Sequence, residues 1–142
     1  MKNIKFALDN WAYAPEKAHD MDAGFDLRTP YDILCPAHSS CMIDTKVHVE
    51  LPDGYYAKLE SKSGLNVKHG IVSCGGVIDA GYTGTIMAKL YNLSDEDYMF
   101  RQGDKVVQMV IHSIPSVRLV DVNLDDFVET ERGDNGFGSS GR

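Results

Sequence analysis

The chain has 142 residues and a mass of 15.7 kDa, which suits one compact domain and argues against a second. Its formal net charge of −7 argues against a protein that grips a nucleic-acid backbone, because such proteins gather Lys and Arg on one face. The same charge would repel a small polyphosphate, so local cations or a divalent metal such as Mg²⁺ would have to offset it.

The three cysteines form no C-x-x-C pair, so we expect reduced, buried thiols rather than a disulfide framework or a zinc site. The N-terminal MKNIKFAL lacks an apolar signal core, and no run approaches the roughly 18 apolar residues of a membrane span. We therefore expect a soluble, cytoplasmic protein. Many short apolar runs between glycines and prolines predict an all-β chain without a long amphipathic helix.

Residues 3–8 are predicted to form the first strand, and a polar loop then leads to DAGFDLR at 22–28. In a strand, Asp26 would point away from its neighbours Phe25 and Leu27. Two interpretations stay open for Asp26: a carboxylate on a solvated strand face, or a functional carboxylate.

Residues 42–51 alternate most clearly, which predicts one half-buried strand. Pro52-Asp53-Gly54 then predicts a tight turn, after which the alternation resumes to complete a hairpin. His48 lies on the polar face and is expected to face solvent. The expected buried face of the strand consists of Ile43, Thr45, Val47, Val49 and Leu51.

The stretch ESKSGLNVKHGI at 60–71 breaks this alternation. Backbone N–H groups, the hydroxyl of Ser63 and the cation of Lys62 could together bind a phosphate beside Gly64. The alternative is a single helical turn capped by serine, with a solvated lysine. His69 is expected to be structural.

The sequence from Gly75 to Asn92 predicts a hairpin with Asp79 at its bend, because Gly81 and Gly84 supply the positive φ that a reversal needs. Asp79 could cap the turn with its own carboxylate, as aspartates often do. The aromatic Tyr82 beside it favours a functional role instead.

Residues 94–97 read as a solvated turn, 98–100 as a short strand and 101–114 as a core strand apolar on both faces. Gln108 is the one uncharged polar side chain within that apolar run, so it must hydrogen-bond either to backbone or to a ligand phosphate. His112 is expected to be a structural histidine with its hydrogen bonds satisfied. One more strand is predicted over 117–122.

The tail RGDNGFGSSGR, 132–142, follows an acidic linker and has the composition of a disordered segment. It is not a Walker P-loop, which requires G-x-x-x-x-G-K-[ST]. Its N–H groups and serine hydroxyls could wrap a terminal phosphate, Arg132 could neutralise it, and Phe137 could stack on a base.

Five segments resemble, in order, the five motifs of the trimeric dUTPases: DAGFDL, KSG within 60–71, GGVIDAGYTG, GDKVVQMVI and the tail. The resemblance implies an all-β jelly-roll barrel or sandwich over residues 1–131 and a flexible closing tail over 132–142. It also implies a homotrimer with active sites between subunits. Lys62 stands where that family usually has arginine, which keeps the charge but loses the bidentate fork.

The resemblance implies that Asp79 activates the water that attacks the α-phosphorus of dUTP, which yields dUMP and pyrophosphate. Such an enzyme limits uracil in DNA and supplies dUMP for thymidylate synthesis. Asp26 would hold Mg²⁺ through water, and the backbone around Gly76 and Met87 would read uracil. Tyr82 would pack on deoxyribose and exclude a ribose. The remaining implied substrate contacts are Lys62, Ser63, Gly64, Gln108, Arg132, Phe137, Gly138, Ser139 and Ser140.

Two alternatives remain open at this stage. A dCTP deaminase shares the fold, although the Asp79 bend and the Phe137 tail are those expected of the hydrolase. The chain could also be a non-catalytic nucleotide-binding or regulatory module, in which Lys62 would mark lost chemistry. Ammonia release from dCTP and pyrophosphate release from dUTP separate these possibilities.

Overall fold

The structure, a computed structural model, describes residues 2–136. It is mostly β with one short helix, α1 (Ser63–His69), and a 3₁₀ turn, η1 (Leu124–Asp126), which confirms the expected all-β class. The strands are β1 (Lys5–Leu8), β2 (Gly24–Arg28), β3 (Ile33–Cys35), β4 (Ser39–Asp44), β5 (Val47–Glu50), β6 (Tyr55–Ser61), β7 (Ile71–Ser73), β8 (Val77–Ile78), β9 (Met87–Asn92), β10 (Tyr98–Phe100) and β11 (Lys105–Ser113).

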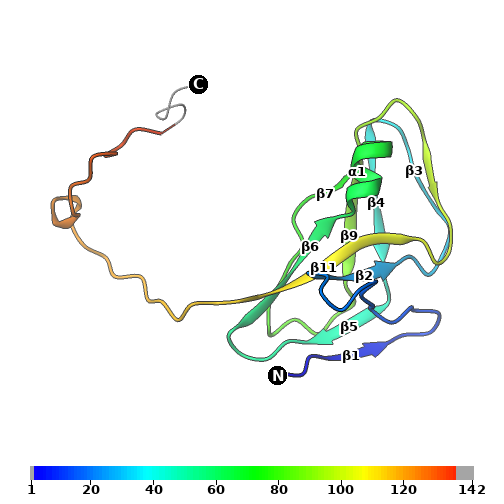
Figure 1. Ribbon diagram of the computed structural model, residues 1–142, viewed down its shortest axis with the longest axis horizontal. Coiled ribbons are helices and arrows are strands. Elements are labelled where there is room, and N and C mark those ends of the chain that lie inside the picture. Colours follow the sequence, from blue (N-terminus) through cyan, green and yellow to red (C-terminus); the bar gives the residue numbers. More distant parts are fainter. Residues whose placement is uncertain (1, 137–142) are drawn as a thin grey trace.

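Two larger and two small antiparallel sheets surround one core (Figure 1). One sheet has the order β2-β11-β6-β8 and the other the order β4-β9-β7, while β1 pairs with β5 and β10 with β3. Apolar side chains from both sheets meet in a single buried cluster, which supplies the main driving force for folding. Its fully buried members include Leu27, Ile43, Val47, Ile71, Ile86, Leu90, Phe100, Val106 and Val107.

The prediction of one strand over 42–51 is wrong, although its buried face is correct. The chain bends at Lys46, whose φ is 61°, so that β4 pairs with β9 while β5 pairs with β1. Thr45 stabilises the bend: its N–H and its hydroxyl both donate to the carbonyl of Ile86, at 3.1 and 2.8 Å. Buried and exposed side chains still alternate across the bend, because the buried side chains before and after it pack into the same core.

Both predicted hairpins are also wrong. Strands β5 and β6 do not pair, since β6 lies between β11 and β8. Strand β8 pairs with β6, whereas β9 pairs with β4 and β7, so the Asp79 turn connects the two sheets.

Residues 114–136 leave the β domain as an extended segment (Figure 1). The strand predicted over 117–122 does not form, because no neighbouring strand in the described chain offers it hydrogen bonds. Large apolar side chains along the segment are exposed, among them Val117, Leu119 and Phe127. No helix in residues 2–136 is long and apolar enough to cross a membrane.

Three side-chain expectations need separate comment. Cys35 and Cys41 are buried free thiols as expected, but Cys74 is exposed. His112 stacks on Tyr56 with ring centroids 5.0 Å apart, and its buried Nε2 has no hydrogen-bond partner within the described residues. The expectation of a fully satisfied His112 is therefore wrong.

Candidate active site

The turn between β8 and β9 borders a cavity of about 220 Å³. The base of the cavity is apolar and its rim carries the one charged group of the lining, the Asp79 carboxylate. Its lining consists of Leu59, Gly76, Val77, Ile78, Asp79, Tyr82, Ile86 and Met87. A concave apolar site with few polar groups is typical of small-molecule binding.

Asp79 does not serve mainly as a turn cap. The turn is closed through the backbone, because the N–H of Tyr82 donates to the carbonyl of Asp79 at 3.0 Å. Asp79 is exposed at the rim, so its carboxylate is open to a water or a ligand. The structure therefore favours the functional interpretation of Asp79 over the capping one.

Two glycines shape the cavity. Gly76 has a φ of +83°, and a Cβ there would lie 2.8 Å from the Cβ of Leu59, so no larger residue fits without displacing β6. The Leu59 N–H donates to the Gly76 carbonyl at 2.9 Å, which fixes this approach. At Gly84 a Cβ would lie 2.6 Å from the Tyr82 hydroxyl. That hydroxyl donates to the Thr85 carbonyl at 2.8 Å, which orients the ring.

The predicted phosphate-binding stretch forms α1, and the N-cap is Lys62 rather than a serine. No side chain caps the helix, so the alternative of a serine-capped turn is wrong. Ser63 and Gly64 are exposed at its first turn. Lys62 is not solvated either, because its ammonium group pairs with Asp26.

Asp26 is buried between two lysines and is only 5% exposed, so a solvated strand face is excluded. One carboxylate oxygen accepts from Lys62, and the other lies 2.7 Å from Lys105 Nζ. Burial raises the pKa of Asp26, but the hydrogen bonds from Lys105 and Lys62 outweigh it, so its pKa lies below the usual range. We call these three residues the charge triad.

Sequence reasoning missed Lys105. It opens the run GDKVVQMVI, and β11 pairs with β2 so that Lys105 faces Arg28 while Gln108 faces Asp26. A lysine at the start of an apolar strand, beside a strand that carries a single carboxylate, is the signal that could have identified it.

Replacing Asp26 with asparagine is expected to lower the unfolding free energy at neutral pH by about 3 kcal/mol, because two partly buried ammonium groups lose their counter-ion. Since the folded-state pKa is lowered, this stabilisation exists above the unfolded-state pKa and disappears as the pH falls through the folded value. Urea titrations from neutral to acid pH measure it. Equal acid sensitivity in the two proteins would contradict the assignment.

Gln108 connects the charge triad to β6. Its Nε2 donates to the Ser61 carbonyl at 3.2 Å, which supports the backbone interpretation of this half-buried amide. The Ser61 hydroxyl in turn accepts from the Ser73 N–H at 2.8 Å. This network fixes the chain directly before Lys62.

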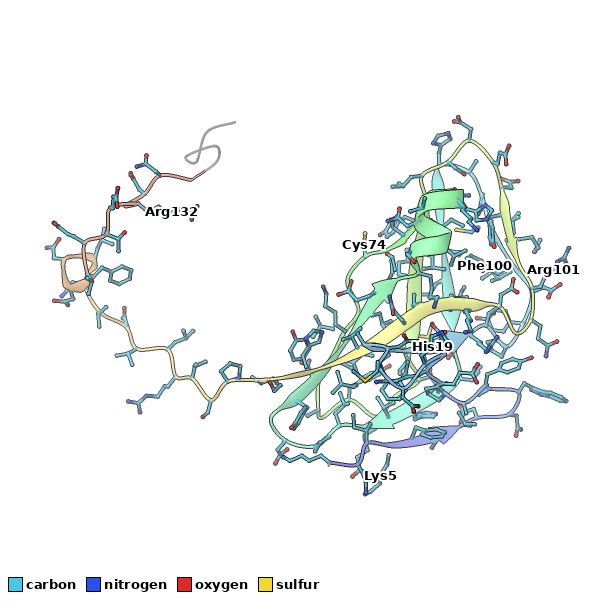
Figure 2. All side chains as sticks on the ribbon, in the orientation of Figure 1. Lys5, His19, Cys74, Phe100, Arg101 and Arg132 are labelled. Atoms are coloured by element: carbon cyan, nitrogen blue, oxygen red, sulfur yellow. The ribbon has the colours of Figure 1, made fainter. Side chains whose placement is uncertain are left out.

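The predicted site residues thus fall into two neighbouring groups joined by β6, whose Leu59 lines the cavity and whose Ser61 adjoins the triad. Arg132 joins neither group: it lies on the extended segment away from the β domain, whereas Cys74 lies on the domain itself (Figure 2). The predicted contacts Phe137, Gly138, Ser139 and Ser140 fall outside the described residues.

The carboxylates near the cavity suit Mg²⁺ only as contacts through water, with the metal bound mainly by substrate phosphates. Residues 2–136 contain no cluster of three or more His, Cys, Asp or Glu side chains that could cage a metal. Mg²⁺ bound to substrate phosphates keeps several waters and needs few protein carboxylates. Asp26 is 5% exposed and already paired with Lys62 and Lys105, so it could take part only through a metal-bound water and not as a direct ligand.

Comparison with known proteins agrees with the family resemblance of the five sequence motifs. Residues 10–141 match the dUTPase family. The deoxyuridine 5'-triphosphate nucleotidohydrolase of Arabidopsis thaliana is 40% identical over 134 residues, which cover 94% of this chain and 80% of that protein. The Candida albicans protein of the same name is 37% identical over 128 residues, 90% of this chain and 80% of the relative.

Solved structures agree. The dUTPase of Staphylococcus bacteriophage 80alpha with dUpNHpp superposes over the full length of both chains with a TM-score of 0.89 at 29% identity. A mutant dUTPase of S. aureus phage phi11, described as coordinating a structural Mg(II) ion, covers 89% of this chain and 100% of its own, with a TM-score of 0.80 at 29% identity.

The chain belongs to the dUTPase family, as the five motifs predicted. As a member of that family it is a dUTP diphosphatase, an enzyme that hydrolyses dUTP.

Proposed function

We propose that this enzyme converts dUTP to dUMP and pyrophosphate with a water molecule activated by Asp79. The observation that carries the proposal is the exposed Asp79 carboxylate at the rim of the cavity, beside Tyr82, in a turn that the backbone closes without it. Pyrophosphate release from dUTP in Mg²⁺ buffer tests the proposal directly. Absence of release would contradict it.

The cavity suits the nucleoside. Its apolar base between Leu59 and Ile86 would hold uracil, and the backbone near Gly76 and Met87 would supply hydrogen bonds to the base. Tyr82 is 44% exposed and held by Thr85, so its ring face can pack on deoxyribose and leave no room for a 2′-hydroxyl.

The phosphates would extend toward α1. Lys62, Ser63, Gly64 and Gln108 lie at or beside its first turn, where positive charge and N–H groups stabilise the leaving pyrophosphate. An aspartate is a weak base, so positioning and charge stabilisation would supply most of the acceleration. Mg²⁺, when bound with the substrate, would neutralise phosphate charge, with Asp26 as its contact through water.

The proposed homotrimer accounts for the separation of Arg132 from the cavity. In one chain the segment 114–136 departs from the β domain with its apolar side chains exposed, as packing against another copy would require (Figure 1). Arg132 and the tail, 132–142, would then close over a neighbour's nucleotide. Residues 1–131, that is the β domain and the first part of the extended segment, would carry the rest of the site.

The dCTP deaminase alternative has less support, because both the family match and the relatives are dUTPases. Ammonia release from dCTP remains its test. The alternative of a non-catalytic module requires a lost base or a lost cavity, whereas Asp79 and the cavity are both present.

Replacing Lys62 with alanine is expected to lower kcat/KM for dUTP by about 10- to 100-fold, because a charge-assisted contact to phosphate is lost. Lys62→Arg should keep or improve kcat/KM, since arginine restores the fork that the family usually has. Steady-state kinetics measure both variants. If Lys62→Ala had the native kcat/KM, the role of Lys62 would be limited to its ion pair with Asp26.

A further inference from the structure

His48 lies on the polar face of β5 as expected and its side chain is 29% exposed, but it also contacts the active-site turn, which the sequence did not indicate. It lies on β5 opposite Ala7 of β1. Its Nδ1 is 2.7 Å from the carbonyl oxygen of Thr83, the residue after Tyr82. Its Nε2 is 3.2 Å from a carboxylate oxygen of Asp9, in the loop that follows β1.

Both contacts can be hydrogen bonds in only one protonation state of the ring. A backbone carbonyl and an ionised carboxylate can only accept hydrogen bonds. The ring can satisfy Thr83 and Asp9 together only when both of its nitrogens carry protons, that is, as an imidazolium. When His48 is neutral, only one ring nitrogen carries a proton. The other nitrogen then presents a lone pair to an acceptor, so one of the two hydrogen bonds is lost.

We propose that His48 is a positioning residue, which as an imidazolium ties the turn bearing Asp79 and Tyr82 to the N-terminal loop and releases one end of that tie on deprotonation. The inference rests on the proposed function for its effect on catalysis. The contacts themselves do not depend on that function. The turn is also anchored at its far end, where the Ile86 N–H donates to the Val47 carbonyl at 2.8 Å and the Ile86 carbonyl accepts from Thr45. Nearer to Asp79, the bonds from Tyr82 to Asp79 and to Thr85 are internal to the turn, so His48 adds a tie close to Tyr82.

Charged groups around His48 favour the imidazolium. The Thr83 carbonyl and the Asp9 carboxylate raise the pKa of His48, and Asp44 raises it further although Lys46 pairs with Asp44 at 2.8 Å. The neighbouring pair of Lys5 and Glu50, at 2.9 Å, lines the same cavity of about 340 Å³ as His48 and Thr83. We call the two contacts of His48, to Thr83 and to Asp9, the His48 bridge. The bridge is complete below the raised pKa of His48, and one of its contacts is lost as the pH rises through that pKa.

The test compares KM for dUTP between about pH 6 and about pH 9. The ratio of KM at the higher pH to KM at the lower pH should be about fivefold larger in the native enzyme than in the His48 variants. This factor corresponds to the difference in strength between a charge-assisted and a neutral hydrogen bond. His48→Asn, which keeps a donor for Thr83, should show the alkaline KM at every pH. His48→Phe, which keeps neither contact, should have a higher KM that does not vary with this ionisation. In all three proteins kcat should change less than KM.

The matched control is His38→Asn. His38 also pairs with an aspartate, Asp95, at 2.7 Å, but lies in the turn between β3 and β4 outside the cavity. Its φ of 52° is one that asparagine tolerates, and this variant should keep the native pH profile. A native KM profile in His48→Phe, or in His48→Asn if the former does not fold, overturns the proposal.

A second measurement separates failure of this inference from failure of the proposed function. The titration of the His48 ring followed by NMR should show a pKa that falls when Asp9 is replaced by asparagine, whatever Asp79 does in catalysis. An unchanged titration of His48 in Asp9→Asn would show that the bridge does not exist. An active Asp79→Asn enzyme would instead contradict the assignment of the general base.

Discussion

Replacing Asp79 with asparagine is expected to lower kcat for dUTP by about 10²- to 10⁴-fold while binding persists. Asparagine can hold a water molecule in the cavity but cannot accept its proton. The turn should survive, because the Tyr82 N–H to Asp79 carbonyl bond involves only the backbone. The variant should therefore bind dUpNHpp, the nucleotide in the phage 80alpha structure, with a Kd within about threefold of the native value.

The control for this variant is Asp53→Asn, which removes a carboxylate from another turn, between β5 and β6, outside the cavity lining. Its kcat should stay within about twofold of the native value. If Asp79→Asn turned over dUTP at nearly the native rate, another group would have to activate the water.

Mixing two inactive proteins is expected to restore about a quarter of the active sites. One protein is Asp79→Ala, which lacks the base, and the other ends after Glu131, which removes Arg132 and the tail. Neither should hydrolyse dUTP alone. After joint refolding in equal amounts, random closed assembly pairs an intact turn from one chain with an intact tail from another in about one site in four.

The result distinguishes two arrangements of the site. If the tail closed over its own subunit, no site in any mixture would contain both parts, and activity would stay absent. Mass measurement of the refolded species verifies that mixed assemblies have formed. The control mixture of each protein with itself should give no activity, which excludes contamination and reversion. Recovery in mixed trimers would place the base and the tail of one site on different chains.

Sequence patterns identified the family and the buried side chains better than they predicted the strand pairing. The side chains of Ile43, Thr45 and Val47 are buried as their alternation indicated, yet a bend at Lys46 sends β4 and β5 to different partners. A period-2 pattern reports which side chains face the core, and it carries no information about which strand lies alongside. The two hairpins failed for that reason.

The charge triad and the His48 bridge escaped prediction because both depend on contacts between distant parts of the chain. Asp26 and Lys105 meet only because β2 pairs with β11, and His48 meets Asp9 only because β5 pairs with β1. Each residue seen alone is a common surface type, and a solvated role was the simplest interpretation. The motifs identified the family because each is a short continuous segment, such as the one around Asp79, that can be recognised without knowing the strand pairing.

Lys62 and Lys105 share one buried carboxylate, so substitutions at these three positions are expected to be coupled during evolution. Arginine in place of Lys62 would keep the positive charge beside Asp26, and so would arginine in place of Lys105. A change that removes charge at any of the three positions leaves the other two unbalanced, so it should persist only beside a second change. Related enzymes are thus expected to exchange lysine and arginine at these two positions more often than they lose the carboxylate.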